Sequence, residues 1–147
     1  MSIKNPFRLQ KISEGLKDIP ILLANESRKY FIEAFKNQAW DGKPWKEVKR
    51  RQPGTPEYKY PKNKGLGRRT SAILVRTGTL RRAVNNSITE ASMTGFKIKV
   101  TVPGEYASYL NDGTNKMPAR TFVGHTKELE QRQRKIFDRE FEKIWQG

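Results

Sequence analysis

The sequence predicts a small α+β domain in which two long helices, N-terminal and C-terminal, pack with a small antiparallel sheet. Three observations predict this fold class. Apolar residues recur at helical spacing over residues 18–40 and again over 126–145. Between them, apolar and polar residues alternate over 96–102, which is the period of a half-buried strand. The length of 147 residues fits one core, so we expect a single domain over 1–147.

The first long helix is expected to follow a short amphipathic segment that ends near Gly15. Asp18 is then the expected N-cap. Pro20 falls in the first helical turn, where its missing N–H removes no hydrogen bond. From there the helix is expected to run about five turns and to end before Asp41.

Positive charge is concentrated in the middle of the chain. The whole chain holds 30 basic and 15 acidic residues, but residues 43–82 alone hold 13 basic and 2 acidic ones. Prolines and glycines recur in the same stretch, and they oppose both helices and β ladders. We therefore expect a long basic extended arm or loop over about 41–70, inserted into the domain. Its candidate contacts for DNA or for an acidic protein are Lys43, Lys46, Lys49, Arg50, Arg51, Tyr58, Lys59, Tyr60, Lys62, Lys64, Arg68 and Arg69.

A corner and a short helix are expected after the arm. Gly78 lies between two threonines, where a glycine permits a corner with positive φ. Thr77 or Thr79 is the expected cap of a short helix over 80–84, with Leu80 pointing back to the core.

The predicted sheet is a hairpin. The alternating strand over 96–102 is preceded by a turn at Thr94 and Gly95, and residues 87–93 are its expected antiparallel partner. An exposed edge of this strand would offer unpaired backbone groups to a neighbouring chain.

Two further helices complete the predicted domain. A single helical stretch over 106–110 is expected to stop at Gly113, which suits a left-handed residue after a helix. Thr126 is the expected cap of the long C-terminal helix, with Glu128 and Glu130 in a first turn that favours negative charge.

No catalytic arrangement stands out in the sequence. There is no cysteine, and the single histidine, His125, is expected to face solvent or to cap the last helix. The carboxylates of that helix alternate with Arg and Lys, as on a solvated helix face. We expect no enzyme activity, no cofactor and no metal. The chain has no apolar run of about 18 residues and no signal peptide, so we expect no membrane contact and a soluble, cytosolic product.

Four short strings are more particular than the rest. Two tryptophans bracket a turn, a T-G-x-L corner follows the arm, a Y-A helix ends at a glycine, and a P-A-R-x-F segment precedes the last helix. At least one tryptophan is expected to cover the open edge of the core. Arg120 is expected to clamp a carboxylate or carbonyls, and Phe122 to plug the sheet.

In this order and spacing, the strings resemble the phage virion morphogenesis proteins of tailed bacteriophages, the tail-completion or neck proteins of the Mu-like type. Thr121 stands where that family often has proline. Asn111 and Asp112 stand where it often has His or Glu. The residues that carry the resemblance are Trp40, Trp45, Leu74, Thr77, Gly78, Leu80, Tyr106, Ala107, Gly113, Pro118, Ala119, Arg120 and Phe122.

The resemblance implies a structural virion protein, assembled in the host cytoplasm, that forms a ring of about six copies at the head–tail junction. Its implied neighbours are head-completion or portal-side proteins and tail-tube proteins. We expect the arm to reach an adjacent subunit or ring. The charge of the arm also fits non-specific contact with phage DNA or pairing with an acidic protein surface.

A different class of function remains open on the sequence alone. A basic nucleic-acid-binding protein, for example a ribosome-associated or DNA-packaging factor, needs only the charge and a small α+β fold. This alternative leaves the T-G-x-L corner and the P-A-R-x-F segment unexplained.

Overall fold

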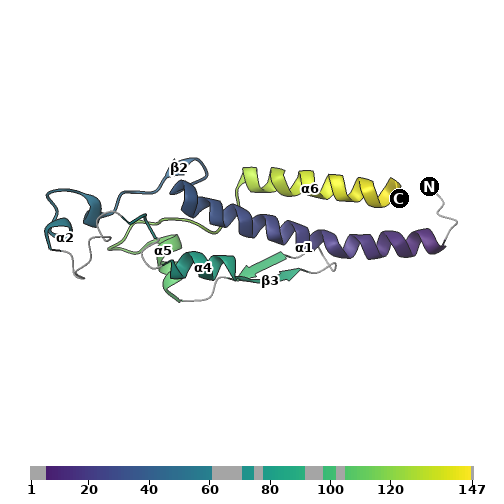
Figure 1. The fold of residues 1–147 in the computed structure, drawn as a ribbon, viewed down its shortest axis with the longest axis horizontal. Coiled ribbons are helices and arrows are strands. Elements are labelled where there is room, and N and C mark those ends of the chain that lie inside the picture. The colour runs from purple at the N-terminus through teal and green to yellow at the C-terminus, as the bar shows by residue number, and fades with distance from the viewer. Residues whose placement is uncertain (1–5, 61–70, 75–77, 92–97, 102–104, 147) are drawn as a thin grey trace. The chain divides into compact units, whose positions relative to one another are not determined.

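A computed structural model describes residues 6–60, 71–74, 78–91, 98–101 and 105–146. The predicted fold class is confirmed: long N- and C-terminal helices pack together, and a small two-stranded antiparallel sheet accompanies them (Figure 1). In chain order the elements are α1 (Pro6–Asn37), β1 (Ala39–Trp40), β2 (Lys43–Pro44), the 3₁₀ helix η1 (Lys49–Arg51), α2 (Pro56–Lys59), α4 (Thr79–Asn85), β3 (Ile88–Ala91), β4 (Ile98–Thr101), α5 (Glu105–Asp112) and α6 (Lys127–Gln146).

The chain forms two compact units. The first, here called the helix unit, consists of Met1–Tyr30, Ser87–Thr101 and His125–Gly147. The second, here called the motif unit, consists of Phe31–Asn86 and Val102–Gly124. Helix α1 contributes its first part to the helix unit and its last two turns to the motif unit.

Helix α1 is continuous, so the expected break near Gly15 and the expected N-cap at Asp18 are wrong. Pro20 lies in the helix interior and is buried together with Ile19. A proline there removes one backbone hydrogen bond, and tertiary packing outweighs that loss. Gly15 marks a close approach of α6, because a Cβ at this position would lie 2.7 Å from Cγ1 of Ile144.

Hydrogen bonds join α1 to α6 within the helix unit. The Gln133 side chain donates to the Ser27 hydroxyl at 2.8 Å and to the Leu23 carbonyl at 3.2 Å. The buried Thr126 hydroxyl donates to the Tyr30 hydroxyl at 3.0 Å. These contacts fix which face of α1 lies against α6.

Helix α6 begins as predicted. The Leu129 N–H donates to Oγ1 of Thr126 at 3.1 Å, so Thr126 caps the helix. Along the exposed side, Arg134 pairs with Glu130 at 2.9 Å, one helical turn away.

A second group of charges lies near the end of α6. The Arg139 guanidinium donates to the Glu140 carboxylate at 3.1 Å, and the Lys143 ammonium at 3.2 Å. The hydrogen bond from Arg139 has the larger effect of the two, and together they lower the pKa of Glu140 below its ordinary value. The outer side of α6 therefore carries charges of both signs that neutralise one another.

Replacing Thr126 by Ala is expected to destabilise the chain by about 1–2 kcal/mol, because α6 loses its cap and the Tyr30 hydroxyl loses a partner. Urea unfolding measures the change. Thr126→Ser, which keeps the hydroxyl, is the control and is expected to lose much less. Equal midpoints for Thr126→Ala and the parent would show that the cap contributes nothing.

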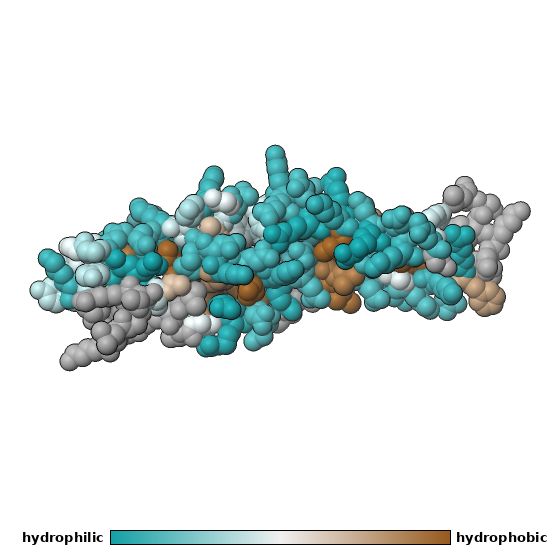
Figure 2. All heavy atoms as spheres, turned by 45° about the horizontal axis from the view of Figure 1, so that its top comes forward, coloured by the Kyte–Doolittle hydropathy of each residue, from teal (hydrophilic) through white to brown (hydrophobic). Residues whose placement is uncertain are grey.

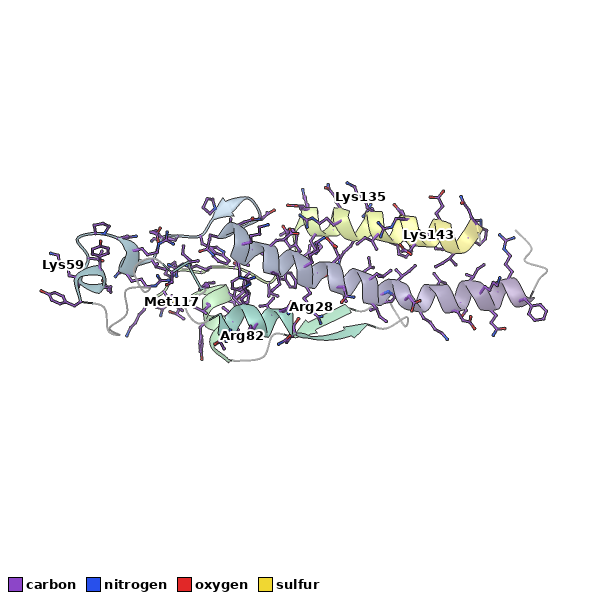
Figure 3. All side chains as sticks on the ribbon, viewed as in Figure 1. Arg28, Lys59, Arg82, Met117, Lys135 and Lys143 are labelled. Carbon is purple, nitrogen blue, oxygen red and sulfur yellow. The ribbon has the colours of Figure 1, made fainter. Side chains whose placement is uncertain are left out.

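Strands β3 and β4 form the predicted antiparallel pair, with Ile88 opposite Thr101 and Ala91 opposite Ile98. Among the described residues this sheet has two strands. The expected turn at Thr94 and Gly95 lies outside the described residues. The Arg28 side chain on α1 donates to the Ser87 carbonyl at 2.7 Å, which ties the start of β3 to α1 (Figure 3).

In the motif unit, the first part of the arm is more regular than expected. Strands β1 and β2 form a short hairpin at its start, and η1 and α2 follow. The expectation that prolines exclude helices here is wrong for α2, because Pro56 occupies the first helical turn, where no N–H is needed. Thr55 caps this turn by accepting a hydrogen bond from the Tyr58 N–H. The remainder of the arm, 61–70, lies outside the described residues.

Glycines end or begin two helices of the motif unit. Gly78 has φ +72° and is itself the residue that precedes α4. Thr79 is the first residue of α4, so a cap by Thr79 is wrong, and Thr77 lies outside the described residues. The positive φ of Gly78 places the turn at the glycine. Gly113, with φ +77°, directly follows α5, as predicted.

Candidate functional site

Three of the four motif strings of the sequence meet in the motif unit near three aromatic rings. Phe35 comes from the end of α1, Trp45 follows β2, and Phe122 follows α5. Their exposed fractions are 3%, 7% and 1%. The Phe35 ring lies 5.6 Å from Trp45, edge to face, and 5.3 Å from Phe122. Trp45 is therefore a core residue, while Trp40 is half-buried and lies 6.1 Å from Phe31.

The P-A-R-x-F segment binds the start of the arm. The indole N–H of Trp45 donates to the Thr121 carbonyl at 2.8 Å. Arg120 is 6% exposed, and its guanidinium donates to the carbonyls of Lys46 at 2.9 Å and Glu47 at 3.4 Å. The sequence left both a carboxylate and carbonyls open as partners of Arg120, and the structure shows carbonyls. An arginine fork suits two neighbouring carbonyls and fixes the direction of the chain that carries them.

Asn111, at the end of α5, organises the same segment. Its side-chain oxygen accepts the N–H groups of Phe122 and Val123, both at 3.0 Å, and its backbone carbonyl accepts the Thr121 hydroxyl at 3.2 Å. Sequence reasoning gave Asn111 no role, because its partners lie ten or more positions away. An amide two residues before a helix-ending glycine was the one local signal.

Gly113 allows the end of α5 and the P-A-R-x-F segment to lie in direct backbone contact. A Cβ at this position would lie 2.6 Å from the Ala119 nitrogen and 3.0 Å from the Met117 carbonyl oxygen. Between Gly113 and Ala119 the chain makes a tight reversal, in which the Thr114 N–H donates to the Met117 carbonyl at 2.8 Å. The glycine thus allows two backbone segments to touch.

The two ends of the arm are also held together. The Arg50 guanidinium donates to the carbonyls of Ser71 at 3.0 Å and Ala72 at 3.1 Å. The Gln38 amide bonds the backbone N–H and carbonyl of Ile73. Sequence reasoning listed Arg50 as a contact for DNA or an acidic partner, but these bonds place its guanidinium at the base of the arm. It missed Gln38, whose partner is 35 positions away.

The remaining arm residues of the prediction lie mostly at the surface. Tyr60 is 78% exposed, and Arg51 and Tyr58 are half-buried. Two of the three carboxylates of the arm pair within it, Glu47 with Arg51 at 3.4 Å and Glu57 with Lys49 at 3.9 Å. The exposed lysines are Lys43, Lys46, Lys49 and Lys59, the last on α2 (Figure 3). Lys62, Lys64, Arg68 and Arg69 lie outside the described residues.

The other motif residues range from buried to exposed. Ala107 is buried, Leu74 and Leu80 are half-buried, and Pro118 and Ala119 are exposed. Leu74 has φ +60°. Thr77 and the side chain of Tyr106 are not among the parts of the chain that the structure describes.

The His, Asp and Glu side chains of the described ranges form no metal-binding cluster. No group of three His, Cys, Asp or Glu residues there could hold a metal ion. His125 is 72% exposed and lies 3.5 Å from the Glu130 carboxylate. Among the described helices, none is both long and apolar enough to cross a membrane. The site is therefore defined by backbone clamps and buried rings.

No family model, curated protein or solved structure matches this chain.

Loss of the Arg120 clamp is expected to weaken the start of the arm. Arg120→Met keeps much of the buried stem but leaves the Lys46 and Glu47 carbonyls without this donor, which should cost about 1–3 kcal/mol. Urea unfolding measures the stability, and limited trypsin digestion measures cleavage at residues 46–51, which we expect to become faster. The matched control is Lys116→Met at an exposed position. Unchanged stability and cleavage would contradict the clamp.

Proposed function

We propose that this chain is a structural virion protein of a tailed bacteriophage, a ring-forming component of the junction that joins the DNA-filled head to the tail. The observation that supports this most is the convergence of three of the four motif strings. The tryptophan string, the Y-A helix and the P-A-R-x-F segment meet at Trp45, Asn111, Thr121 and Phe122, in contacts that span up to 76 positions. Packing of these strings against one another is what a shared fold would require.

The geometry supports an assembly role physically. Buried rings and backbone clamps hold the described parts of the motif unit together, and Arg50 joins η1 to Ser71 and Ala72, which follow 61–70 in the chain. A loop held at both ends is suited to reach a neighbouring subunit, because less conformational entropy is lost on binding. The partners proposed are copies of the same chain, head-completion or portal-side proteins, and tail-tube proteins. Localisation in the virion follows from the same proposal.

The direct test is to produce phage particles without this chain. The proposal expects filled heads and separate tails to accumulate unjoined, and the wild-type chain supplied from a plasmid to restore joined, infectious particles. Joined particles at the normal yield would overturn it.

The role of the arm needs a deletion that spares its base. Removal of 53–69 keeps Arg50 and the carbonyls of Ser71 and Ala72, so the motif unit is expected to stay folded. If the arm reaches a neighbouring subunit or ring, this variant folds but does not restore joined particles. Full restoration would exclude that role.

Nucleic-acid binding is the second candidate function, favoured by the charge of the motif unit. Residues 31–86 hold 14 basic and 4 acidic residues, and two of the acidic ones, Glu47 and Glu57, are paired inside the arm. Gel-shift binding over a salt series tests it. Phosphate contacts predict a log–log slope of roughly −0.9 per contact, and an absent or flat response would discard this function.

A further inference from the structure

Basic residues are distributed unevenly along the chain, and they identify a partner better than the exposed apolar residues do. On the face that Figure 2 shows, the surface is mainly hydrophilic and apolar residues form small separate patches, which is normal for a protein surface. Residues 58–89, by contrast, include no acidic residue. The same stretch holds eight basic residues: Lys59, Lys62, Lys64, Arg68, Arg69, Arg76, Arg81 and Arg82. Helix α4, which lies wholly within this stretch, therefore carries positive charge and no negative charge.

Helix α4 separates its apolar and polar side chains onto opposite faces. Successive residues of a helix are rotated by about 100°, which places Leu80, Ala83 and Val84 within an arc of about 100°. These three side chains are half-buried or buried, so this arc faces the core of the motif unit. The opposite arc, here called the α4 basic face, has four exposed residues: Thr79, Arg81, Arg82 and Asn85.

The Arg82 side chain lies along the α4 basic face, toward the start of the helix. Its Nη2 donates to the Thr79 hydroxyl at 3.5 Å, and its Nη1 lies 3.1 Å from the position that a Cβ on Gly78 would occupy. A hydroxyl carries no charge, so it orients the guanidinium without neutralising it. Arg82, labelled in Figure 3, therefore presents a full positive charge at an exposed position.

The two arginines of the α4 basic face differ from the exposed arginines of α6. On α6, Arg134 pairs with Glu130 at 2.9 Å, and Arg139 pairs with the carboxylate of the next residue at 3.1 Å. Within the described residues, no carboxylate lies within ion-pair distance of Arg81 or Arg82. The charge of the α4 basic face is therefore not compensated by the described parts of the chain, and an external anion can pair with it.

We propose that the α4 basic face binds the phosphates of double-stranded DNA. Arginine, threonine and asparagine side chains all donate hydrogen bonds to phosphate oxygens in protein–DNA complexes, and the planar guanidinium suits a phosphate especially well. The inference rests on the second candidate function, nucleic-acid binding, and gives it a location on a folded helix outside the arm. It is also compatible with the first, because DNA that leaves a filled head passes the junction with the tail.

The composition of the face favours DNA over an acidic protein as the occupant. Protein interfaces usually bury aromatic or large apolar side chains at their centre. The α4 basic face has none, since its four residues are polar or charged. Binding to a DNA backbone needs no apolar centre, because the release of counterions from the phosphates supplies much of the free energy.

The test measures binding of the full chain to double-stranded DNA of arbitrary sequence, by fluorescence anisotropy over a salt series. Arg81→Gln and Arg82→Gln are combined in one variant, which keeps a good helix former at both positions. Because two phosphate contacts are lost, we expect the log–log salt slope to become less steep by about 1.8. Binding at about 0.1 M salt is expected to weaken at least about tenfold.

The matched control combines Arg134→Gln and Arg139→Gln on α6. It removes the same charge from exposed arginines that already pair with carboxylates, so it is expected to keep the wild-type slope and to bind within about threefold of wild type. Circular dichroism checks the fold of each variant. Asn85→Glu retains both arginines of α4 and adds a negative charge beside them. It replaces the α4 double variant if that does not fold, and it is also expected to weaken DNA binding.

The outcomes separate this site from the proposed functions. Equal losses for the two double variants would overturn the α4 site, because binding would then follow net charge alone, and the nucleic-acid candidate would stand. A wild-type chain that does not bind DNA would overturn both, and its binding to poly-glutamate would indicate an acidic protein partner instead. The particle-joining experiment tests the virion function separately, because its outcome does not depend on which residues bind DNA.

Discussion

Replacing Phe122 by Ala is expected to destabilise the chain by about 3–5 kcal/mol, the loss typical of a fully buried phenylalanine. Phe122 is 1% exposed and packs at 5.3 Å on Phe35. The truncation leaves a cavity that the rigid surroundings fill poorly, because Asn111 and Trp45 hold the adjoining backbone. Since natural domains are stable by only about 5–15 kcal/mol, this single change is expected to leave a marginal fold.

The measurement for Phe122→Ala is the free energy of unfolding in urea. Tyr109→Ala, at a 55% exposed position on α5, is the matched control and is expected to change stability by less than about 0.5 kcal/mol. A Phe122→Ala midpoint equal to that of the control would show that the aromatic cluster is not the core of the motif unit.

Gly113→Ala is expected to cost about 2–4 kcal/mol. The left-handed φ of +77° opposes any side chain, at about 1–2 kcal/mol. In addition, the new Cβ would meet backbone atoms of Ala119 and Met117 at 2.6–3.0 Å, and backbone moves less readily than a side chain. Urea unfolding again measures the change.

Gly42 offers a matched control for this prediction. Its φ of +74° is nearly the same, but nothing lies within 4 Å of the position of its Cβ. Gly42→Ala is therefore expected to show the cost of backbone conformation alone, and the difference between the two variants measures the close approach. Equal losses would mean that Gly113 is needed only for its φ.

Local signals predicted much of the fold. The alternation over 96–102 fell within a real antiparallel pair, and the cap at Thr126 and the stop at Gly113 are where the sequence placed them. These features depend on neighbouring residues, which a single sequence displays. The expected helix start at Asp18 is wrong for the opposite reason, because burial of Ile19 and Pro20 inside α1 outweighs the local preference of proline for a first helical turn.

The candidate site was only partly predictable for the same reason. The residue types of Trp45 and Phe122 indicated burial, and that of Arg120 indicated hydrogen bonds to a carboxylate or carbonyls. None of the three indicated which residues they would contact. Asn111 and Gln38 act on backbone groups 10–35 positions away, and nothing in their local sequence points there. Long-range backbone recognition depends on how the elements pack.

We propose that this chain is a built-in part of the head–tail junction, and one measurement tests this directly. The most direct measurement is electron microscopy of intact phage particles that carry a gold-labelled tag after Gly147. We expect label at the junction between head and tail in particles that remain infectious. Label absent from purified particles, with the tagged chain found instead on nucleic acid or ribosomes in infected cells, would contradict it.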